Sequence, residues 1–327
     1  MDKVEGIEER VGISVSPKKI PPKRKKSFWT RLYEQRQLAV LTLPFVAVIL
    51  VFNYMPIWGW LYAFQDFKPR LGLWNSTWVG LENFKNLFGD EFFYRALRNT
   101  LGISSLKLVL NFASTITLAV LLNEVRHTYL KRVVQTVSYL PHFVSWVVAA
   151  NLVFVALSTD GGIVNEILLK IGLVSEPISF MGEGNYFWAV AALSEVWKEV
   201  GFGAIIYLSA MAGIDLELYE AASMDGAGRI RRIFTITLPS IAPTIKILLI
   251  LSVGWILSAG FDQVYLMQKP SNWDYSEILE LYIFKYGIQQ NKWSFASAAG
   301  IFNSVVGLTL VLTANKISKK LDGERVF

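Results

Sequence analysis

The sequence predicts an all-α integral membrane protein with six transmembrane helices, on the basis of its composition and the lengths of its apolar runs. Of its 327 residues, 53% are hydrophobic and only 18% are charged, and the mean hydropathy is +0.39. A helix needs roughly 20 apolar residues to cross the hydrocarbon core of a bilayer. Backbone amides find no water there, so such runs must be helical. Six runs are long enough: Leu38–Ala63, Ala96–Asn123, Val133–Leu157, Phe187–Met211, Ile241–Phe261 and Phe295–Ala314.

The composition also excludes several classes of protein. The chain has no Cys, which excludes disulfide scaffolds, thiolate catalysis and Cys-ligated zinc, and its two His are too few for a His-rich metal centre. No phosphate-binding loop of the form GxxxxGK[ST] occurs, so the chain does not itself hydrolyse ATP by that route. We therefore expect no catalytic residue, no metal site and no bound cofactor. Buried core helices of a water-soluble protein are a poor alternative, because too little polar sequence remains to cover six such runs.

The distribution of positive charge predicts the orientation. Ten of the 32 Lys and Arg lie in residues 1–37, which we interpret as a disordered basic cytoplasmic tail that contacts anionic lipid rather than nucleic acid. Segments on the same side as this tail carry 21 Lys and Arg, whereas those on the other side carry nine. Positive loops stay in the cytoplasm, so both termini are expected there. Residues 38–316 then form the transmembrane domain, and residues 317–327 form a second cytoplasmic tail.

One outer segment has helical spacing without the length to span. Apolar residues between Ile163 and Val174 recur at helical intervals, with Asn165, Glu166 and Lys170 between them. This pattern predicts a short amphipathic helix lying flat at the outer interface.

The cytoplasmic segment between the fourth and fifth runs, residues 215–239, carries the strongest local signals. Asp215 suits the N-cap of a short helix, and Gly226 permits the backbone angles of a tight turn. A second helix is expected over Arg229–Thr237, and Pro239 and Pro243 are acceptable in the first turn of the next span. The segment is predicted to be a helix–turn–helix that projects into the cytoplasm between two membrane helices.

This segment resembles the EAA loop of the permeases of ABC importers, and in particular of the carbohydrate importers. In that family the loop is a coupling helix that docks into a cleft of the ATPase subunit. The resemblance assigns this coupling role to nine residues. They are Tyr219, Glu220, Ala221, Ala222, Asp225, Gly226, Ala227, Leu238 and Pro239.

Other stretches are similar to the subgroup that imports polysaccharide fragments: Tyr54-Met55-Pro56, residues 78–84, Arg98-Asn99-Thr100, residues 139–145 and residues 162–165. The resemblance covers about residues 35–325. It implies a type I importer permease fold in a bacterial cell membrane. It also implies a second, related permease, two ATPase subunits that bind ATP and Mg²⁺, an extracellular or periplasmic sugar-binding protein, and an oligosaccharide substrate.

Polar and aromatic residues inside the runs are candidates for the translocation pathway, because intramembrane ionisable groups are costly and usually face a cavity or the protein interior. Glu195 and Lys198 lie one turn apart and are expected to pair on one helix face. Packing between helices remains the alternative role for every candidate, and Lys107 in the second run has the same ambiguity. The candidates are Trp146, Asn151, Glu195, Trp197, Lys198, Trp255 and Asn303.

Two other functions remain open at this stage. An ion-coupled secondary transporter usually shows internal repeats, and none is evident in this sequence. An integral-membrane enzyme would need clustered His or carboxylates at a membrane face, where only scattered ones occur. The sequence does not distinguish fragments of alginate, pectin or xylan as the substrate.

Overall fold

The structure is a computed structural model that describes residues 35–322. Nearly all of the expected basic tail therefore lies outside the described residues. Within residues 35–322 four helices are long and apolar enough to cross a membrane, and the number rises to six if each of two bent helix pairs is one span. The chain divides into two units, Met1–Trp58 and Gly59–Phe327, which are described separately.

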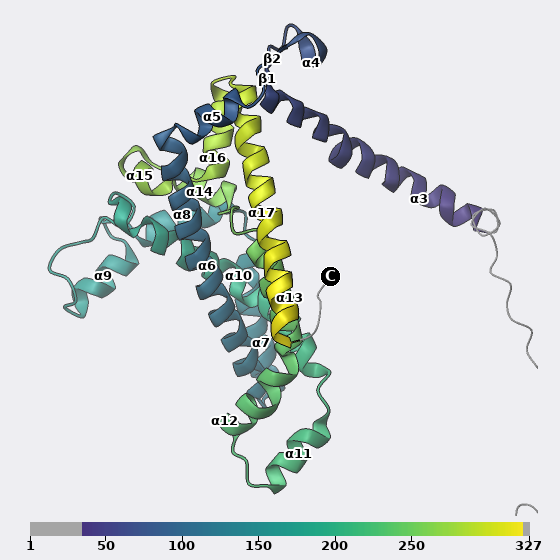
Figure 1. Ribbon diagram of the computed structural model, residues 1–327. Helices are drawn as coiled ribbons and strands as arrows, with labels where there is room; N and C mark the ends of the chain where they lie inside the picture. Colours follow the sequence, from purple (N-terminus) through teal and green to yellow (C-terminus); the bar gives the residue numbers. More distant parts are fainter. Residues whose placement is uncertain (1–34, 323–327) are drawn as a thin grey trace, which may run out of the picture. The chain divides into compact units, whose positions relative to one another are not determined.

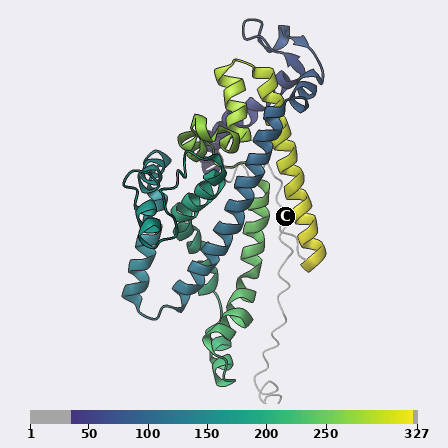
Figure 2. The ribbon, with the colours of Figure 1, turned by 90° about the vertical axis from the view of Figure 1, so that its left-hand side faces the viewer.

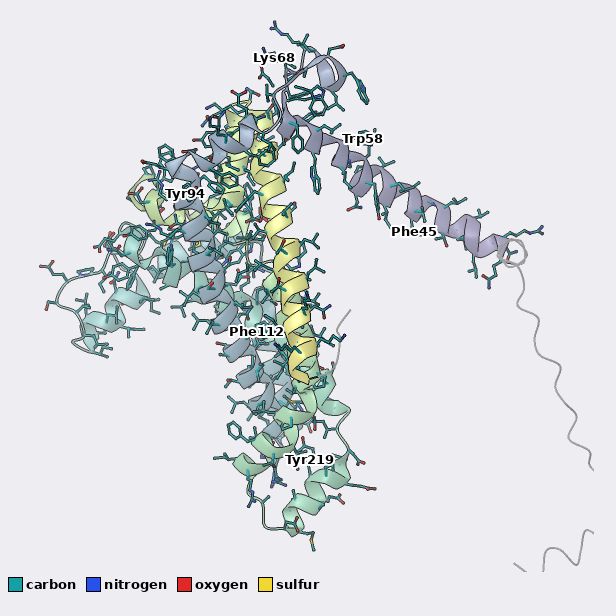
Figure 3. All side chains as sticks on the ribbon, in the orientation of Figure 1. Phe45, Trp58, Lys68, Tyr94, Phe112 and Tyr219 are labelled. Atoms are coloured by element: carbon teal, nitrogen blue, oxygen red, sulfur yellow. The ribbon has the colours of Figure 1, made fainter. Side chains whose placement is uncertain are left out.

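The described part of the first unit is a single apolar helical segment. It begins with α3 (Arg36–Ile49), passes through a π-helical turn (η1, Leu50–Tyr54) and enters the 3₁₀ segment η2 (Met55–Phe64). Its large apolar side chains are exposed, Phe45 and Phe52 at 72% each, and Figure 3 shows Phe45 and Trp58 on this segment. A helix that is apolar all round belongs in a membrane or against other helices.

Four long helices form the body of the second unit: α6 (Glu91–Glu124), α10 (Phe187–Ala212), α13 (Leu238–Gly254) and α17 (Trp293–Asp322). Figures 1 and 2 show these helices running alongside one another. Small residues allow the close approach: Gly203 of α10 lies against Thr115 of α6, and a Cβ on Gly102 would lie 2.4 Å from the Trp188 ring. Such small-residue contacts are typical of packing between membrane helices.

The chain over 133–157 is two helices rather than the single helix expected from its apolar run. Helix α7 (Thr128–Tyr139) continues into a 3₁₀ turn (η3, Leu140–Phe143), and α8 (Trp146–Ala156) then leaves at 106° to it. Pro141 lies in the turn, and Ser145 caps α8 by accepting a hydrogen bond from the N–H of Val148. A proline and a new helix cap together end one helix and start another.

The fifth span also differs from the expectation. A continuous helical segment runs through α12 (Arg229–Arg232), a π-helical turn (η5, Ile233–Thr237) and α13, so the expected second helix over 229–237 is not separate from the span. Pro239 has no N–H to donate to the preceding turn, and the widened π turn ends two residues before it. The helix ends at Gly254, seven residues before the expected end, and Pro243 lies inside it. At the C-terminus α17 continues to Asp322, so the first part of the expected C-terminal tail, residues 317–322, is helical.

Shorter elements complete the second unit, with α11 at the opposite end of the long helices from β1, β2 and α5 (Figure 1). The two-stranded antiparallel sheet pairs Gln65 with Trp78. The remaining elements are β1 (Gln65–Asp66), α4 (Gly72–Asn75), β2 (Thr77–Trp78), α5 (Glu82–Phe88), α9 (Ile163–Lys170), η4 (Gly184–Tyr186), α11 (Leu216–Met224), α14 (Phe261–Met267), η6 (Pro270–Asn272), α15 (Trp273–Ser276), α16 (Leu279–Phe284) and η7 (Lys285–Gln289).

Candidate functional site

Helix α11 and the turn after it have the conformation that the sequence predicts. The Asp215 carboxylate caps the helix by accepting a hydrogen bond from the N–H of Glu217 (3.0 Å). Gly226 has φ of 76°, and the N–H groups of Gly226 and Ala227 donate to the carbonyls of Ser223 and Ala222. This is a Schellman ending, which needs a left-handed residue that glycine supplies without strain.

Two side-chain hydrogen bonds fasten α11 to the base of the fifth span. The hydroxyls of Tyr219 and Thr237 lie 2.9 Å apart, and Thr237 is buried. The Arg232 guanidinium donates to the Ser223 hydroxyl at 2.7 Å. Figure 3 places Tyr219 in this region. A displacement of α11 therefore acts directly on the helix that becomes α13.

The nine predicted coupling residues lie together in this segment but differ in exposure. Glu220, Ala221, Asp225, Gly226 and Pro239 are exposed, whereas Tyr219, Ala222, Ala227 and Leu238 are half-buried. Large apolar side chains beside them are also exposed, including Met224 at 89% and Ile230 at 73%. An exposed apolar patch on a projecting loop is typical of a protein-binding surface.

Two adjoining cavities, of about 340 and 350 Å³, lie between α6, α10 and α13. They share Asn111, Phe112, Glu195, Leu248 and Ser252 in their walls, so they form one continuous space, here called the central cavity, whose mainly apolar walls carry several polar groups. Its walls thus combine amide, hydroxyl and carboxylate groups with an aromatic ring. Such convergent polar groups on an otherwise apolar wall are typical of a small-molecule site.

The ammonium group of Lys107 organises one end of the central cavity. It donates to the Ala259 carbonyl (2.7 Å), to the Gln263 amide oxygen and to Glu195 Oε2 (3.3 Å). Gln263 in turn donates to the Ala191 carbonyl (2.7 Å). Lys107 thereby ties α6 to α10 and to the non-helical segment after α13, and its positive charge is matched by the Glu195 carboxylate.

The structure contradicts the expected pairing of Glu195 with Lys198. Lys198 donates instead to Glu199 Oε1 (2.9 Å) and to the His142 carbonyl (2.8 Å), and the second Glu199 oxygen lies 2.6 Å from His142 Nδ1. The one-turn spacing places Glu195 and Lys198 on neighbouring faces of α10, and each face meets a different helix. Sequence separation along α10 therefore did not decide the partners.

The other pathway candidates lie in different surroundings. Trp255 lines the central cavity, and Trp146 lies under the Lys198 ammonium at 5.5 Å. The Asn151 amide is exposed and donates to the Val147 carbonyl of its own helix. Asn303 is half-buried on α17 and lines neither part of the central cavity.

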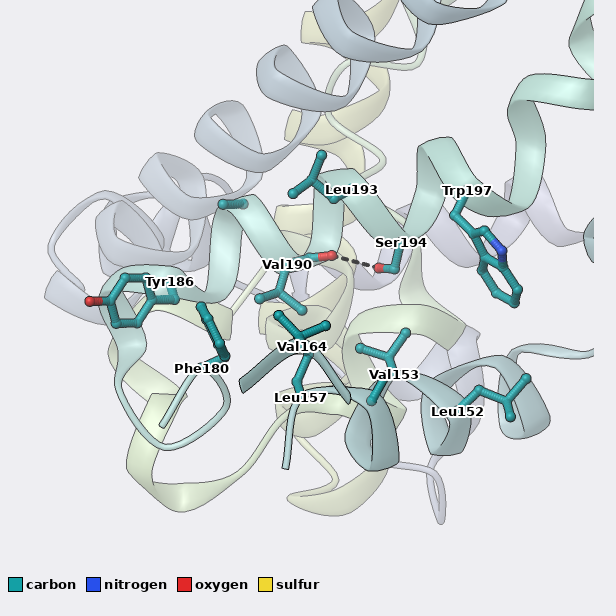
Figure 4. Close-up of a pocket in the computed structure, with 12 residues that line it drawn as sticks. Leu152, Val153, Leu157, Val164, Phe180, Tyr186, Val190, Leu193, Ser194 and Trp197 are labelled. Atoms are coloured by element: carbon teal, nitrogen blue, oxygen red, sulfur yellow. Dashed lines mark hydrogen bonds between the residues drawn. The ribbon is translucent and has the colours of Figure 1, made fainter. Parts of the chain in front are cut away.

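Trp197 lines a separate, apolar pocket of about 490 Å³ between α8, α9 and α10 (Figure 4). Leu152, Val153, Val190 and Leu193 face into it, and the Ser194 hydroxyl is turned to the Val190 carbonyl of its own helix. This pocket has the chemistry of lipid or helix packing rather than of a polar solute.

The sequence analysis named Lys107 but missed several other residues of the central cavity. Ser104, Lys107, Asn111 and Thr115 follow one another at intervals of three and four along α6, which places them on one face of that helix. All four line the cavity, and the Thr115 hydroxyl donates to the Asn111 side-chain oxygen (2.9 Å). This polar stripe is the signal that identifies them.

In residues 35–322 no group of three His, Cys or carboxylate residues is placed to hold a metal ion.

These features define a multi-pass membrane protein with a polar cavity between its helices and a projecting loop at one end. Residues 112–321 match the family described as the binding-protein-dependent transport system inner membrane component. The chain belongs to this family and is therefore a permease subunit of an ABC transporter.

Several relatives are known. The chain is 44% identical to the protein LplB of Bacillus subtilis, over 92% of this chain and 94% of that protein. It is 42% identical to the polygalacturonan/rhamnogalacturonan transport system permease protein YteP of the same species, over 93% and 94%.

Solved structures agree with these relatives. A chain of a bacterial ABC transporter that imports the acidic polysaccharide alginate has 39% identity and a TM-score of 0.82, with 90% of this chain and 99% of that chain covered. A chain from the alginate transporter in complex with its alginate pentasaccharide-bound periplasmic protein has 38% identity and a TM-score of 0.83, with 92% and 100% covered. The predicted type I importer permease fold is thereby confirmed.

Proposed function

We propose that this chain imports oligosaccharides cut from acidic polysaccharides, as one of two permeases in an ATP-driven transporter. The central cavity carries the proposal, because its walls present the hydroxyl, amide and carboxylate groups that bind sugar hydroxyls. Two relatives favour acidic sugars, since one is named for polygalacturonan and the other for alginate. The charged groups that line the cavity are paired: Lys107 with Glu195, both in its walls, and Glu199 with Lys198, which lies outside the walls.

The partners in this proposal are a second permease, two ATPase subunits that bind ATP and Mg²⁺, and an extracellular or periplasmic sugar-binding protein. The loop around α11 is the surface for an ATPase subunit, with Glu220 and Asp225 at its exposed face. The termini and this loop then lie in the cytoplasm of a bacterium, in agreement with the excess of Lys and Arg on that side.

The mechanism follows from how α11 is attached. Closure of the two ATPase subunits moves α11, and its hydrogen bonds to Thr237 and Arg232 carry the movement into α13. Leu248 and Ser252 of α13 line the central cavity, so a rotation of this helix changes the side to which the cavity opens. The chain acts as a gate, and the energy comes from the partner.

The test is ATP-dependent uptake in proteoliposomes that contain the complete transporter, with its binding protein and a labelled trigalacturonate as the probe. Gly226→Pro should lower uptake tenfold or more while ATP hydrolysis continues, since proline cannot adopt φ of 76°. Gly228→Pro is the matched control, because Gly228 has φ of −68°, which proline adopts without strain.

Uptake that survives Gly226→Pro unchanged would contradict the lever mechanism. Wild-type uptake that continues without ATP and stops on addition of an ionophore would contradict the ATP-driven transporter itself and favour an ion-coupled carrier.

A further inference from the structure

The two parts of the central cavity meet at a wall that carries both polar and aromatic groups. The residues that line both parts come from three helices: Asn111 and Phe112 from α6, Glu195 from α10, and Leu248 and Ser252 from α13. The Glu195 side chain is 25% exposed, so it is mostly buried and still open to the cavity. This wall is here called the junction, and a solute that passes between the two parts contacts it.

Two polar atoms of the junction make no hydrogen bond within the described part of the chain. Glu195 receives the Lys107 ammonium on Oε2 alone, which leaves Oε1 as an acceptor. Asn111 accepts the Thr115 hydroxyl on its side-chain oxygen, which leaves its amide nitrogen as a donor. Neither atom is shut off from solvent, in contrast to the Ser104 hydroxyl of the same cavity. The junction thus offers one accessible acceptor and one accessible donor to a ligand.

The positive charge beside the junction is fully engaged. An ammonium group has three N–H donors, and those of Lys107 go to the Ala259 carbonyl, the Gln263 amide oxygen and the Glu195 carboxylate. Among the described residues that line the central cavity, Lys107 is the only Lys or Arg, whereas Glu195 and Glu199 both line it. The walls therefore present no open cationic donor to an anionic ligand.

The second carboxylate of the walls is already paired on both oxygens. Glu199 Oε1 accepts from the Lys198 ammonium at 2.9 Å, and Glu199 Oε2 lies 2.6 Å from His142 Nδ1. Neither partner lines the central cavity, so the Glu199 charge is compensated from behind the walls. Glu195 is left as the lining carboxylate with an oxygen that a ligand can reach.

We infer that Glu195 is a specificity-determining residue of the central cavity, which binds the hydroxyl-bearing face of a sugar and repels carboxylates. Glu195 Oε1 accepts from one sugar hydroxyl and the Asn111 amide donates to another, since a hydroxyl can act in both ways. A uronate carboxylate would meet the negative charge of Glu195 and find no open N–H on Lys107, and contacts between like charges are unfavourable.

The class of ligand rests on the proposed function, and the inference adds an orientation to it. An acidic oligosaccharide passes this chain with hydroxyl groups toward the junction and with its carboxylates directed away from Glu195. The discrimination comes from an added repulsive group, which is a general way to obtain specificity.

The test measures the affinity of two probes for the assembled transporter in lipid nanodiscs, by saturation-transfer NMR titration without binding protein or nucleotide. Trigalacturonate is the charged probe and its fully methyl-esterified form is the neutral one. Glu195→Gln keeps the shape and an acceptor oxygen but removes the charge, so it should tighten binding of the charged probe threefold or more and change the neutral probe less than twofold. Glu166→Gln, at an exposed carboxylate of α9, is the matched control and should change neither.

A second variant tests the donor of the junction. Asn111→Leu removes an amide that both probes use, so it should weaken both of them threefold or more and leave the ratio of their affinities unchanged. Asn151→Leu on α8 is its control, because Asn151 lines neither part of the central cavity, and it should bind both probes as the wild type does.

The outcomes separate this inference from the proposed function. An unchanged ratio of affinities in Glu195→Gln would overturn the role of Glu195, as would a wild-type transporter that binds neither probe. Equal weakening of both probes by Glu195→Gln would show a merely structural role and would also overturn it. A wild type that binds the probes as expected but imports no oligosaccharide in proteoliposomes would overturn the proposed function alone.

Discussion

The loop around α11 and the network around Lys107 are built in opposite ways. In the loop, every contact that shapes α11 joins residues within 20 positions of one another, as in the Asp215 cap, the Gly226 turn and the Tyr219–Thr237 bond. Lys107, by contrast, is held by residues 88 to 156 positions away. The loop is largely exposed, whereas Lys107 is buried.

This difference indicates which role each region can have in the protein. The loop has a conformation of its own, so it can move as a rigid body against a partner while keeping its shape. The Lys107 network exists only when three segments are assembled, so it reports the arrangement of the helices around the central cavity. Substitutions in the loop should therefore impair coupling with little loss of stability, and substitutions in the network should do the reverse.

The largest expected effect is that of Lys107→Met. Removing the ammonium leaves the Glu195 carboxylate without its cation. A fully buried pair loses about 3–5 kcal/mol in this way, and the loss is smaller here because the Glu195 side chain is 25% exposed. The purified transporter should melt at a clearly lower temperature, measured by the loss of folded protein on heating in detergent. Lys170→Met, at an exposed lysine of α9 that is 3.9 Å from Glu166, should leave the melting temperature unchanged. Equal melting temperatures for both variants would show that Lys107 contributes no assembly energy.

Gly201→Ala should have the next largest effect, at the contact between α10 and α7. A Cβ at this position would lie 2.0 Å from the Ser138 carbonyl oxygen, so the two helices must separate, at a cost of roughly 1–3 kcal/mol. The control is Gly300→Ala on α17, where a Cβ meets no atom within 4 Å and the change should be neutral or slightly stabilising. Thermal unfolding of both variants checks this, and a Gly201→Ala protein as stable as the control would refute the close contact.

Asp215→Ala tests the local part of the comparison. Loss of an N-cap side chain costs about 1 kcal/mol of helix stability. Hydrogen exchange over residues 216–224 should become faster, and the number of sugars imported per ATP should fall, with an unchanged melting temperature of the whole transporter. Asp215→Asn, which keeps a capping oxygen, should restore both values. A drop in melting temperature as large as that of Lys107→Met would erase the distinction between the two regions.

Thr237→Val should have the smallest effect. It removes the hydrogen bond to Tyr219 and keeps the shape of the side chain, at a cost of about 1 kcal/mol or less. Uptake per ATP should decrease about twofold while the rate of ATP hydrolysis is kept, and Thr237→Ser should restore the ratio. An unchanged ratio would mean that the Arg232–Ser223 bond alone fastens α11 to the span.

Much of the fold was predictable because each apolar run satisfies a length requirement on its own. The failures fall where the chain leaves a regular helix. The residues after Tyr139 read as one apolar run, yet the turn at Pro141 and the Ser145 cap divide it. The run after Gly254 also stays apolar, but the chain there is non-helical, and its Ala259 carbonyl accepts a hydrogen bond from the Lys107 ammonium. Hydropathy measures the free energy of moving side chains from water into an apolar medium. It carries little information about where a helix breaks.

The candidate residues for the translocation pathway were also predicted only in part. Glu195 and Trp255 were predicted and do line the central cavity, whereas Asn151 turns to its own helix and Trp197 lines an apolar pocket. Glu195 pairs with Lys107 instead of Lys198, because the meeting of α6 and α10 brings those two side chains together.

The sequence by itself determined that this protein crosses a membrane and that residues 215–227 form a capped helix with a glycine turn, because hydropathy and local hydrogen bonding act over a few neighbouring residues. The tertiary structure alone decided which buried charges pair and where the polar cavities lie. Those properties depend on which helix faces meet, and that is settled by packing between segments far apart in the chain.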